Sequence, residues 1–441
     1  TSKSNRVLQC YKYFSERLKG ISVENRLELF NRLLDQENKI LVIIDLSEKE
    51  DEQAIFDTIN SAGVRLSSAD IIKNALFQKA LDLFENVEDV ETLYIEHWEN
   101  IFTIDEDAIN FWDTPRATGR LMRDNIEILL HSISVIKGFF DPDKHTLSDL
   151  SNLYKAYILK ITKGDLELFI KEISKYAKLY REKILVFNGS TLFNYQDNYS
   201  RLFHILSVCE ISTFHPYILS LFYKYDGDES KLGVELQKLE TLVIRRMITK
   251  SETKSYNKMC KEFIKDNSAV DNRLAEQTKE NIKNGLLTIS NKNATLLLFW
   301  VELFRRAKDS KQSVKELKFN YSLEHILPQK WEEYWSAVDV IDSSGNIITD
   351  REVAKRERYT KIYSIGNMTL LNSSLNTSLR NYEFSRKIEG EGRKRGIRHY
   401  ADLGITRFDI LDKYDNGDKI WNEQKINERT ADLANDILTI W

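Results

Sequence analysis

Apolar side chains recur along most of this chain three or four positions apart, which is the spacing of helices that bury one face. Residues 5–20 and 23–35 follow the pattern, with Tyr11, Phe14 and Leu18 on one face of the first segment. Further helices are expected at 89–102, 117–136, 147–161, 166–185, 217–225, 233–249 and 294–307. Only 4 prolines and 16 glycines interrupt 441 residues, too few for a sandwich or barrel, so the pattern predicts a mainly helical protein.

Two features near the start of the chain depart from the plain helical pattern. Residues 40–46 (ILVIIDL) form a continuous, β-branched apolar run, which is typical of a buried strand. Farther on, Ser67 or Ser68 should cap a helix that begins near Ala69, with Asp70 in its positively charged first turn.

The pattern changes again at Phe319. A strand at 319–323 leads into Glu324 and His325, and a second strand is expected at 365–371. Between and after these strands the pattern predicts a helix at 331–337, a hairpin at 338–348, and helices at 351–363, 382–388 and 420–441.

The size and composition of the chain limit the classes of protein it can be. A chain of 441 residues is longer than the length at which a single hydrophobic core stops growing, so two or three domains are expected. No run approaches the length of a membrane span and no signal peptide heads the chain, which predicts a cytoplasmic protein. Cys10, Cys209 and Cys260 are distant and odd in number, which fits a reducing compartment and small buried side chains.

The charge is distributed unevenly. The chain carries a net −4, yet residues 355–400 hold eleven Lys or Arg against four Glu. A basic segment on an acidic protein indicates where a polyanion could bind, although a solvated charged surface explains such a segment equally well.

The chemistry of the chain concentrates around these two predicted strands. Glu324 and His325 are adjacent at a strand end and therefore point to opposite sides. The carboxylate suits Mg²⁺ or Mn²⁺, and the imidazole suits general-base catalysis. Asn367, after a glycine at the start of the second strand, can tie the backbone of the first segment with its side-chain amide. Asn376 can offer a neutral oxygen to the same cation.

The segments EHILPQ, IGNMTLL and LNTSLRNYEFSRK together resemble the His-Asn-His endonucleases, specifically the C-terminal nuclease domain of GmrSD-type, modification-dependent restriction enzymes. The resemblance implies that His325 is the general base, that Glu324 and Asn376 are metal ligands, and that Asn367 is the structural asparagine of the catalytic site. Lys387 matches a recurrent basic residue. Residues of the terminal helix also match: Trp421, Ile426, Arg429, Leu433 and Trp441. We expect DNA contacts from Lys387 and from the adjacent cluster Arg393, Lys394 and Arg395.

The stretch FDTINSAGVRLSSADIIKNALF, from Phe56, resembles the second half of the ParB- and sulfiredoxin-like N-terminal domain of the same enzymes. That domain is credited with nucleotide binding and with sensing modified DNA, which implies nucleotide contacts from Asn60, Arg65 and Lys73. A turn and a helix surface explain Asn60 and Lys73 equally well. The family's Asp-Gly-Gln-Gln-Arg motif is absent from this chain. Either the sequence begins downstream of the motif, as the initial Thr1 leads us to expect, or the protein lacks it.

These observations predict a mainly α protein made of a helical scaffold, a small β-containing N-terminal remnant and a C-terminal ββα-metal (His-Asn-His) nuclease domain. The expected domains are 1–115 for nucleotide binding and sensing, 116–310 for the scaffold, and 311–441 for the nuclease. Its expected activity is hydrolysis of foreign, modified phage DNA with Mg²⁺ or Mn²⁺, with an NTP as a further candidate cofactor of the N-terminal domain. A catalytically inactive DNA-binding sensor, a ribonuclease toxin and a homo-oligomeric state stay open.

Overall fold

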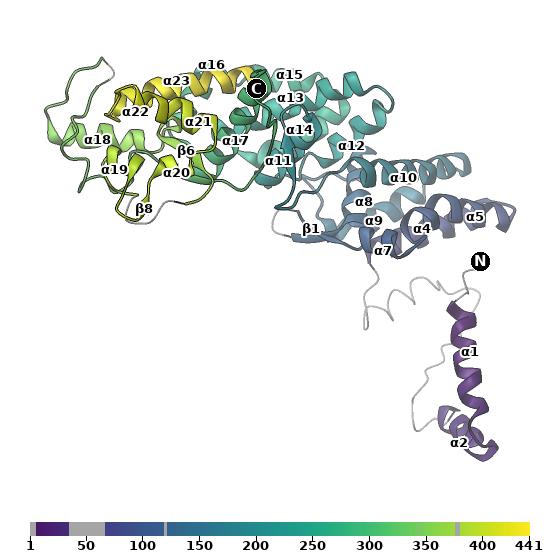
Figure 1. Ribbon diagram of the computed structural model, residues 1–441. Coiled ribbons are helices and arrows are strands. Elements are labelled where there is room, and N and C mark those ends of the chain that lie inside the picture. The colour runs from purple at the N-terminus through teal and green to yellow at the C-terminus, as the bar shows by residue number, and fades with distance from the viewer. Residues whose placement is uncertain (1–5, 35–66, 119–120, 343, 375–379) are drawn as a thin grey trace. The chain divides into compact units, whose positions relative to one another are not determined.

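The computed structural model describes residues 6–34, 67–118, 121–342, 344–374 and 380–441 (Figure 1). The chain divides into two compact units, Thr1–Leu66 and Ser67–Trp441. The first unit contains α1 (Arg6–Lys19) and α2 (Val23–Leu34), which confirms the two helices expected there. The strand predicted at 40–46 lies outside the described residues.

The second unit begins with α4 (Ser68–Leu83), whose start was predicted correctly. Ser67 is the N-cap, and its Oγ accepts a hydrogen bond from the backbone N–H of Asp70 at 3.1 Å. The helix buries Ala69, Ile72, Leu76 and Ala80. It is followed by α5 (Val87–Tyr94), the π-helical turn η1 (Ile95–Glu99), α6 (Asn100–Phe102) and α7 (Glu106–Trp112).

The helix predicted from residue 117 starts only at residue 125. A short antiparallel pair, β1 (Pro115–Thr118) and β2 (Leu121–Asp124), occupies the preceding positions, and α8 (Asn125–Ile136) follows. Asn125 determines this boundary because its amide nitrogen donates to the Phe111 carbonyl at 2.7 Å, while its amide oxygen accepts from the Tyr180 hydroxyl at 3.1 Å. These two long-range bonds hold the start of α8, and helical periodicity does not reveal them.

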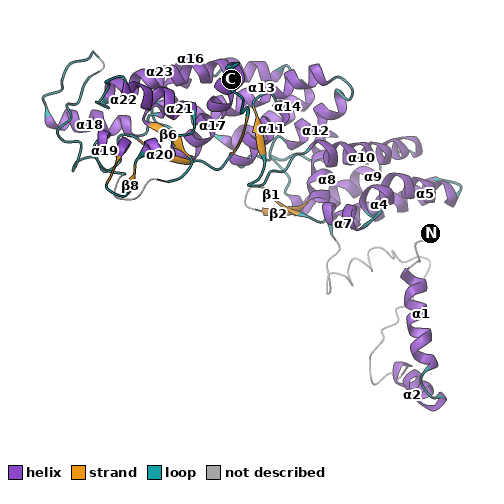
Figure 2. Ribbon diagram, viewed as in Figure 1, coloured by secondary structure: helices purple, strands orange, loops and turns teal. Residues whose placement is uncertain are grey.

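Helices make up most of the rest of the second unit (Figure 2). In order they are η2 (Leu147–Asp149), α9 (Leu150–Ile158), α10 (Lys163–Lys183), α11 (Asn198–Val208), α12 (His215–Lys224), α13 (Glu229–Ile248), η3 (Thr253–Ser255), α14 (Tyr256–Lys265), α15 (Ala269–Ala275) and α16 (Lys279–Leu286). Their apolar faces share one large core. The protein is therefore mainly helical, as predicted.

The helix α17 (Asn291–Lys308) connects this core to the C-terminal segments. It packs against β5 (Ser322–His325), β6 (Met368–Leu371) and α23 (Glu423–Ile440). Strands β5 and β6 are antiparallel, with Glu324 opposite Thr369 and His325 opposite Met368. A second small pair joins β3 (Leu192–Asn194) to β4 (Glu316–Lys318).

Three expectations for the C-terminal part need correction. The strand predicted at 319–323 begins only at Ser322, and the Phe319 ring before it packs against His204 and Phe299. Residues 331–337 form turns and no helix, and the Trp335 carbonyl there accepts from Arg358 at 2.9 Å. The hairpin expected at 338–348 reduces, in its described positions, to one bridge between Ile341 and Ile347.

The remaining elements surround the β5–β6 pair. They are α18 (Arg351–Ile362), η4 (Ile365–Asn367), α19 (Phe384–Glu389), β7 (Gly390–Glu391), β8 (Lys394–Arg395), α20 (Ile397–Tyr400), α21 (Gly404–Thr406), η5 (Arg407–Leu411) and α22 (Asp412–Asp415). A second, smaller core forms beneath α18, α19 and the start of α23. Among the described residues, no helix has the length and apolar character required to cross a membrane.

Candidate active site

His325 is the last residue of β5, and both nitrogens of its ring have a defined environment. Nδ1 lies 2.9 Å from the Ile362 carbonyl oxygen, and Nε2 lies 3.2 Å from the amide oxygen of Asn291. Both neighbours are oxygens that only accept, so a neutral ring can donate to one of them alone. Donation from Nδ1 fits the shorter contact, to Ile362, and leaves the Nε2 lone pair facing the Asn291 oxygen without a hydrogen bond. Burial lowers the pKa of His325, while the bond to Ile362 raises it. The ring is therefore arranged as a neutral base.

Asn367 holds the backbone that follows this histidine and also bonds the Ile362 carbonyl that the histidine contacts. Its amide nitrogen donates to the carbonyls of Leu327 at 2.9 Å and Ile362 at 3.0 Å. Its amide oxygen accepts from the Leu327 N–H at 2.8 Å and from the Trp421 indole N–H at 3.2 Å. These four bonds use the full capacity of a buried amide. The contact with the segment after His325 that the sequence predicts is present, and Asn367 shares the Ile362 carbonyl with His325.

Glu324 points to the other side of β5, where it meets Lys387. The Glu324 carboxylate is buried, and its Oε1 lies 2.7 Å from the Lys387 ammonium. That ammonium also donates to the carbonyls of His325, Ile326 and Arg380. Burial lowers the pKa of Lys387, and Glu324 opposes that effect. Lys387 is fully buried, so our expectation of a DNA contact is corrected: this cation neutralises Glu324 and holds the backbone around His325.

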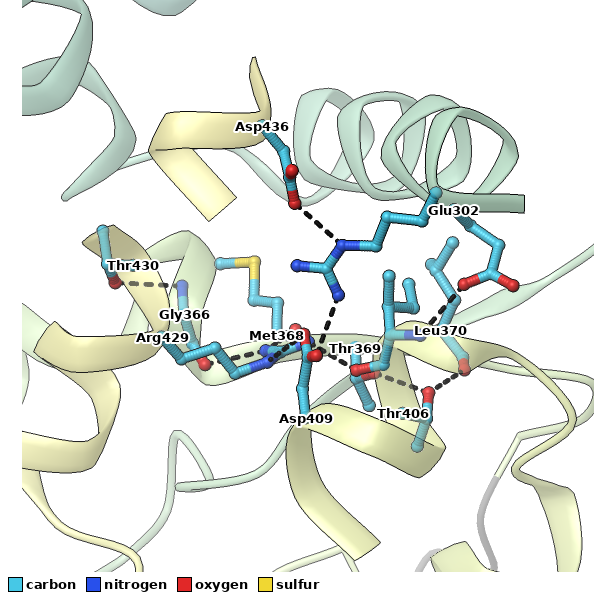
Figure 3. A network of polar contacts seen from close by, with 12 residues as sticks. Glu302, Gly366, Met368, Thr369, Leu370, Thr406, Asp409, Arg429, Thr430 and Asp436 are labelled. Carbon is cyan, nitrogen blue, oxygen red and sulfur yellow. Dashed lines mark hydrogen bonds and ion pairs between the residues drawn. The ribbon is translucent and has the colours of Figure 1, made fainter. Parts of the chain in front are cut away.

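The terminal helix α23 fixes the position of the segment that carries Asn367. Arg429, fully enclosed, donates to the carbonyls of Gly366 at 2.8 Å, Met368 at 2.6 Å and Ile405 at 2.9 Å (Figure 3). Its Nε lies 3.3 Å from Asp409. One guanidinium therefore ties the residues before and after Asn367 to the neighbouring α21.

Gly366 allows this close approach. A Cβ atom at residue 366 would lie 2.2 Å from the Ile426 carbonyl oxygen, so a larger residue would push η4 away from α23. The Gly366 N–H instead donates to the Thr430 hydroxyl at 3.2 Å (Figure 3). Arg305 of α17 adds bonds to Asp409 and Asp436, each at 2.8 Å, which join α17 to the same assembly. The asparagine is thus held by packing as well as by its own hydrogen bonds.

Residues 275–436 match the family described as GmrSD restriction endonucleases, C-terminal domain. The match contains Glu324, His325 and Asn367, and it supports the resemblance to GmrSD-type enzymes. It suggests a restriction endonuclease that acts on DNA. The matched range begins upstream of the boundary expected at residue 311 and includes α16 and α17. No curated protein matches the chain.

Several residues that the GmrSD resemblance singled out are placed elsewhere or are not described. Asn376, Asn60 and Arg65 lie outside the described residues. Lys73 lies on α4, where its ammonium is 3.3 Å from the Asp70 carboxylate. This is the helix-surface environment that we considered as the alternative to a nucleotide contact.

The basic cluster Arg393, Lys394 and Arg395 is exposed on the hairpin formed by β7 and β8. Within the described part of the chain, Arg395 contacts only the neighbouring His399 in a side-chain hydrogen bond. The cluster is therefore available to a polyanion, and its contact with DNA stays a prediction.

The site also contains a residue that the sequence did not single out. Asn291 is the first residue of α17 and reaches Nε2 of His325 from outside the paired strands. The capping signal at Ser290, whose Oγ accepts from the Asn293 N–H, could have placed the helix start here and not at residue 294. Its contact with His325, however, spans 34 positions and leaves no local signal.

Proposed function

We propose that this chain is a metal-dependent DNA endonuclease of the His-Asn-His type in which His325 is the general base. The observation that carries the proposal is the Ile362 carbonyl shared by His325 Nδ1 and the Asn367 amide. This arrangement holds the ring with its Nε2 lone pair free to take a proton. The GmrSD match over the same residues supports phosphodiester hydrolysis as the reaction.

His325 and Asn291 perform separate steps in this proposal. Nε2 of His325 removes a proton from water as the water oxygen forms a bond to phosphorus and the bond to the leaving oxygen breaks. The resulting imidazolium keeps its Nδ1–H bond to Ile362, which stabilises the new positive charge. Asn291, on the other side of Nε2, orients the attacking water.

Glu324 would hold a Mg²⁺ or Mn²⁺ ion, and by resemblance Asn376 would assist. Within the described residues no group of three or more His, Cys, Asp or Glu side chains could bind a metal without help. Glu324 nevertheless fits Mg²⁺, which commonly uses one or two carboxylates together with water and substrate phosphate. The bound cation would neutralise charge on the phosphate and the leaving oxygen. Lys387 holds the Glu324 carboxylate in place, 2.7 Å from its ammonium.

The proposed substrate is foreign DNA, including modified phage DNA, cut in the cytoplasm. The exposed cluster Arg393, Lys394 and Arg395 supports a polyanionic substrate. The second candidate is a DNA-binding sensor without catalysis. It is favoured by the ion pair of Glu324, the proposed metal ligand among the described residues, with the buried Lys387, which balances the negative charge that would attract a cation. A ribonuclease would use the same residues.

Plasmid cleavage tests the proposal. The full chain is incubated with modified plasmid, unmodified plasmid or RNA, in Mg²⁺, Mn²⁺ or EDTA. We expect DNA cleavage that requires the metal, and His325→Ala should lower its rate about 10²- to 10⁴-fold. His97→Ala, outside the matched range, is the control and should cleave normally. Metal-dependent DNA binding without cleavage would favour the sensor, and near-normal cleavage by His325→Ala would exclude His325 as the base.

A further inference from the structure

The molecule also contains a cavity that is separate from the residues around His325. It has a volume of about 530 Å³ and lies where α8, α12 and α14 pack against one another. This volume is typical of small-molecule sites. We call it the α8–α12 cavity and define it by the polar residues Arg123, His131, His145, Thr213, His215 and Asn257, which line it together with apolar side chains.

The lining of the α8–α12 cavity is rich in hydrogen-bond donors and contains no Asp or Glu. Arg123 supplies a full positive charge at its edge. Within the described part of the chain, no hydrogen bond or ion pair engages this guanidinium, and the acidic group that acts on it, Glu127, lies outside the lining. A half-buried arginine without a bonded carboxylate is unusual, because its five donors normally find partners.

The histidines add hydrogen-bonding groups to the cavity that are neutral near pH 7, and Arg123 supplies its positive charge. Burial lowers the pKa of both His131 and His215 to about 4, and Arg123 and His215 are close enough to His131 to lower its pKa further. Basic groups therefore gather here without an acid among them. Nδ1 of His215 is buried and has no hydrogen-bond partner in the described structure.

His145 adds a donor whose orientation is defined. Its Nδ1 accepts a hydrogen bond from the backbone N–H of Asp141 at 2.9 Å. In a neutral ring the proton is then on Nε2, which is available as a donor. The Phe140 ring lies between the rings of His131 and His145, with centroid distances of 4.7 and 5.6 Å, and gives the cavity an apolar wall.

Several deeply buried cations among the described residues have a carboxylate partner, although Arg246 bonds the Glu252 carbonyl and the Ser255 hydroxyl instead. The pairs are Arg201 with Glu240, Arg358 with Glu423, and Lys387 with Glu324. At the α8–α12 cavity, Arg123 has no carboxylate partner among the described residues, and an anion from solution would supply the negative charge. The N-terminus of α12 also faces this cavity through His215 and Pro216, which favours an anion further.

We propose that the α8–α12 cavity binds the phosphate group of a small phosphorylated molecule, with Arg123 and His145 as its principal donors. The guanidinium matches two phosphate oxygens, and Nε2–H of His145 reaches a further oxygen. The Phe140 wall accommodates an apolar part of the ligand. This site is separate from the nuclease site and does not depend on its activity.

Calorimetric titration of the full chain with inorganic pyrophosphate tests the proposal. We expect saturable binding that Arg123→Gln weakens at least about tenfold, because a charge-assisted bidentate contact is lost. The matched control is Arg116→Gln. Arg116 faces Arg123 across the β1–β2 pair and is similarly half-buried, and it lines a neighbouring hollow that shares only Ser212 and His215 with the α8–α12 cavity. It should bind pyrophosphate within about twofold of the unchanged protein.

If Arg123→Gln lowers the melting temperature of the ligand-free protein, its weaker binding could come from partial unfolding, and a second variant then decides. His145→Ala should then show the same selective loss of pyrophosphate binding. Competition by ATP would identify a nucleotide as the source of the phosphate, and resistance to ATP would indicate a free phosphate anion. The proposal is overturned by absence of pyrophosphate binding at millimolar concentration, by an equal loss in Arg116→Gln, or by displacement of pyrophosphate by short duplex DNA.

Discussion

The amide oxygen of Asn291 lies 3.2 Å from Nε2 of His325, although one residue begins a long helix and the other ends a short strand. Because Nδ1 donates to Ile362, Nε2 is the nitrogen left for catalysis. Asn291→Ala should therefore lower kcat about tenfold with little change in KM, since water is still bound but less well oriented. Steady-state cleavage kinetics measure this effect.

Asn293→Ala is the control, because Asn293 lies in the same helical turn and, among the described contacts, makes no side-chain hydrogen bond. Asn291→Gln, which retains the amide, should recover part of the lost kcat. Equal losses in Asn291→Ala and Asn293→Ala would mean that the helix start matters only for stability.

Because Lys387 and Glu324 form a buried ion pair, we expect that replacing Lys387 alone strongly destabilises the protein. Lys387→Met would leave the Glu324 carboxylate buried without its counter-charge, which costs about 3 to 5 kcal/mol. The double variant Glu324→Gln, Lys387→Met should recover much of this loss because no buried charge remains. Urea unfolding of the three proteins measures the difference. A stable Lys387→Met protein with impaired DNA binding would instead return Lys387 to the DNA surface.

Local sequence signals predicted the central part of the site. The apolar run that ends at Glu324 and His325, and the glycine before Asn367, were sufficient to place two strands and the asparagine that ties them. These features depend on residues close together in sequence. The Ser67 cap of α4 is predictable for the same reason.

Long-range contacts decided what the sequence did not predict. Lys387 looks like a surface cation in a basic segment, yet the Glu324 carboxylate draws it into the interior across 63 positions. Arg358 is likewise buried, and it donates to the Trp335 carbonyl in a segment that forms turns where a helix was predicted. Asn291 belongs to a helix predicted to start three residues later. Charge and periodicity alone contain none of this information.

Because His204 is buried, we expect the folded protein to lose stability as the pH falls. It is buried, its Nδ1 accepts from the Trp300 indole N–H at 3.1 Å, and burial lowers its pKa from 6.5 to about 4. Between these values the unfolded chain binds the proton and the folded chain does not, so stability falls as the pH falls, by about 1.4 kcal/mol per pH unit. His204→Gln keeps an acceptor for Trp300 and should show a smaller slope in urea unfolding from pH 6.5 to 4. An unchanged slope would assign the acid sensitivity to other groups.

The exposed hairpin formed by β7 and β8 predicts how DNA affinity depends on salt. Many cations of residues 355–400 are already engaged: Arg386 with Glu391, Arg398 with Glu389 and Asp415, and Lys387 with Glu324. Arg393, Lys394 and Arg395 are exposed and, within the described part of the chain, have no acidic partner. Of the exposed cations of residues 355–400 without an acidic partner in the described structure, these three are adjacent on one hairpin, whereas Lys355, Arg356 and Arg380 lie elsewhere.

Replacing Arg393, Lys394 and Arg395 by Ala should lower the slope of log affinity against log salt by up to about 3, because each phosphate contact releases about one counterion. The loss should be similar for every DNA sequence, since backbone contacts carry no sequence information, and kcat at saturating DNA should stay nearly unchanged. Fluorescence anisotropy at several salt concentrations measures the slope. The control replaces Lys254, Lys258 and Lys265, which are exposed outside the matched range, and it removes the same charge without altering the slope. If both triple variants behave alike, the hairpin contributes only net charge, and the phosphate contacts must come from other cations such as Lys355, Arg356 and Arg380.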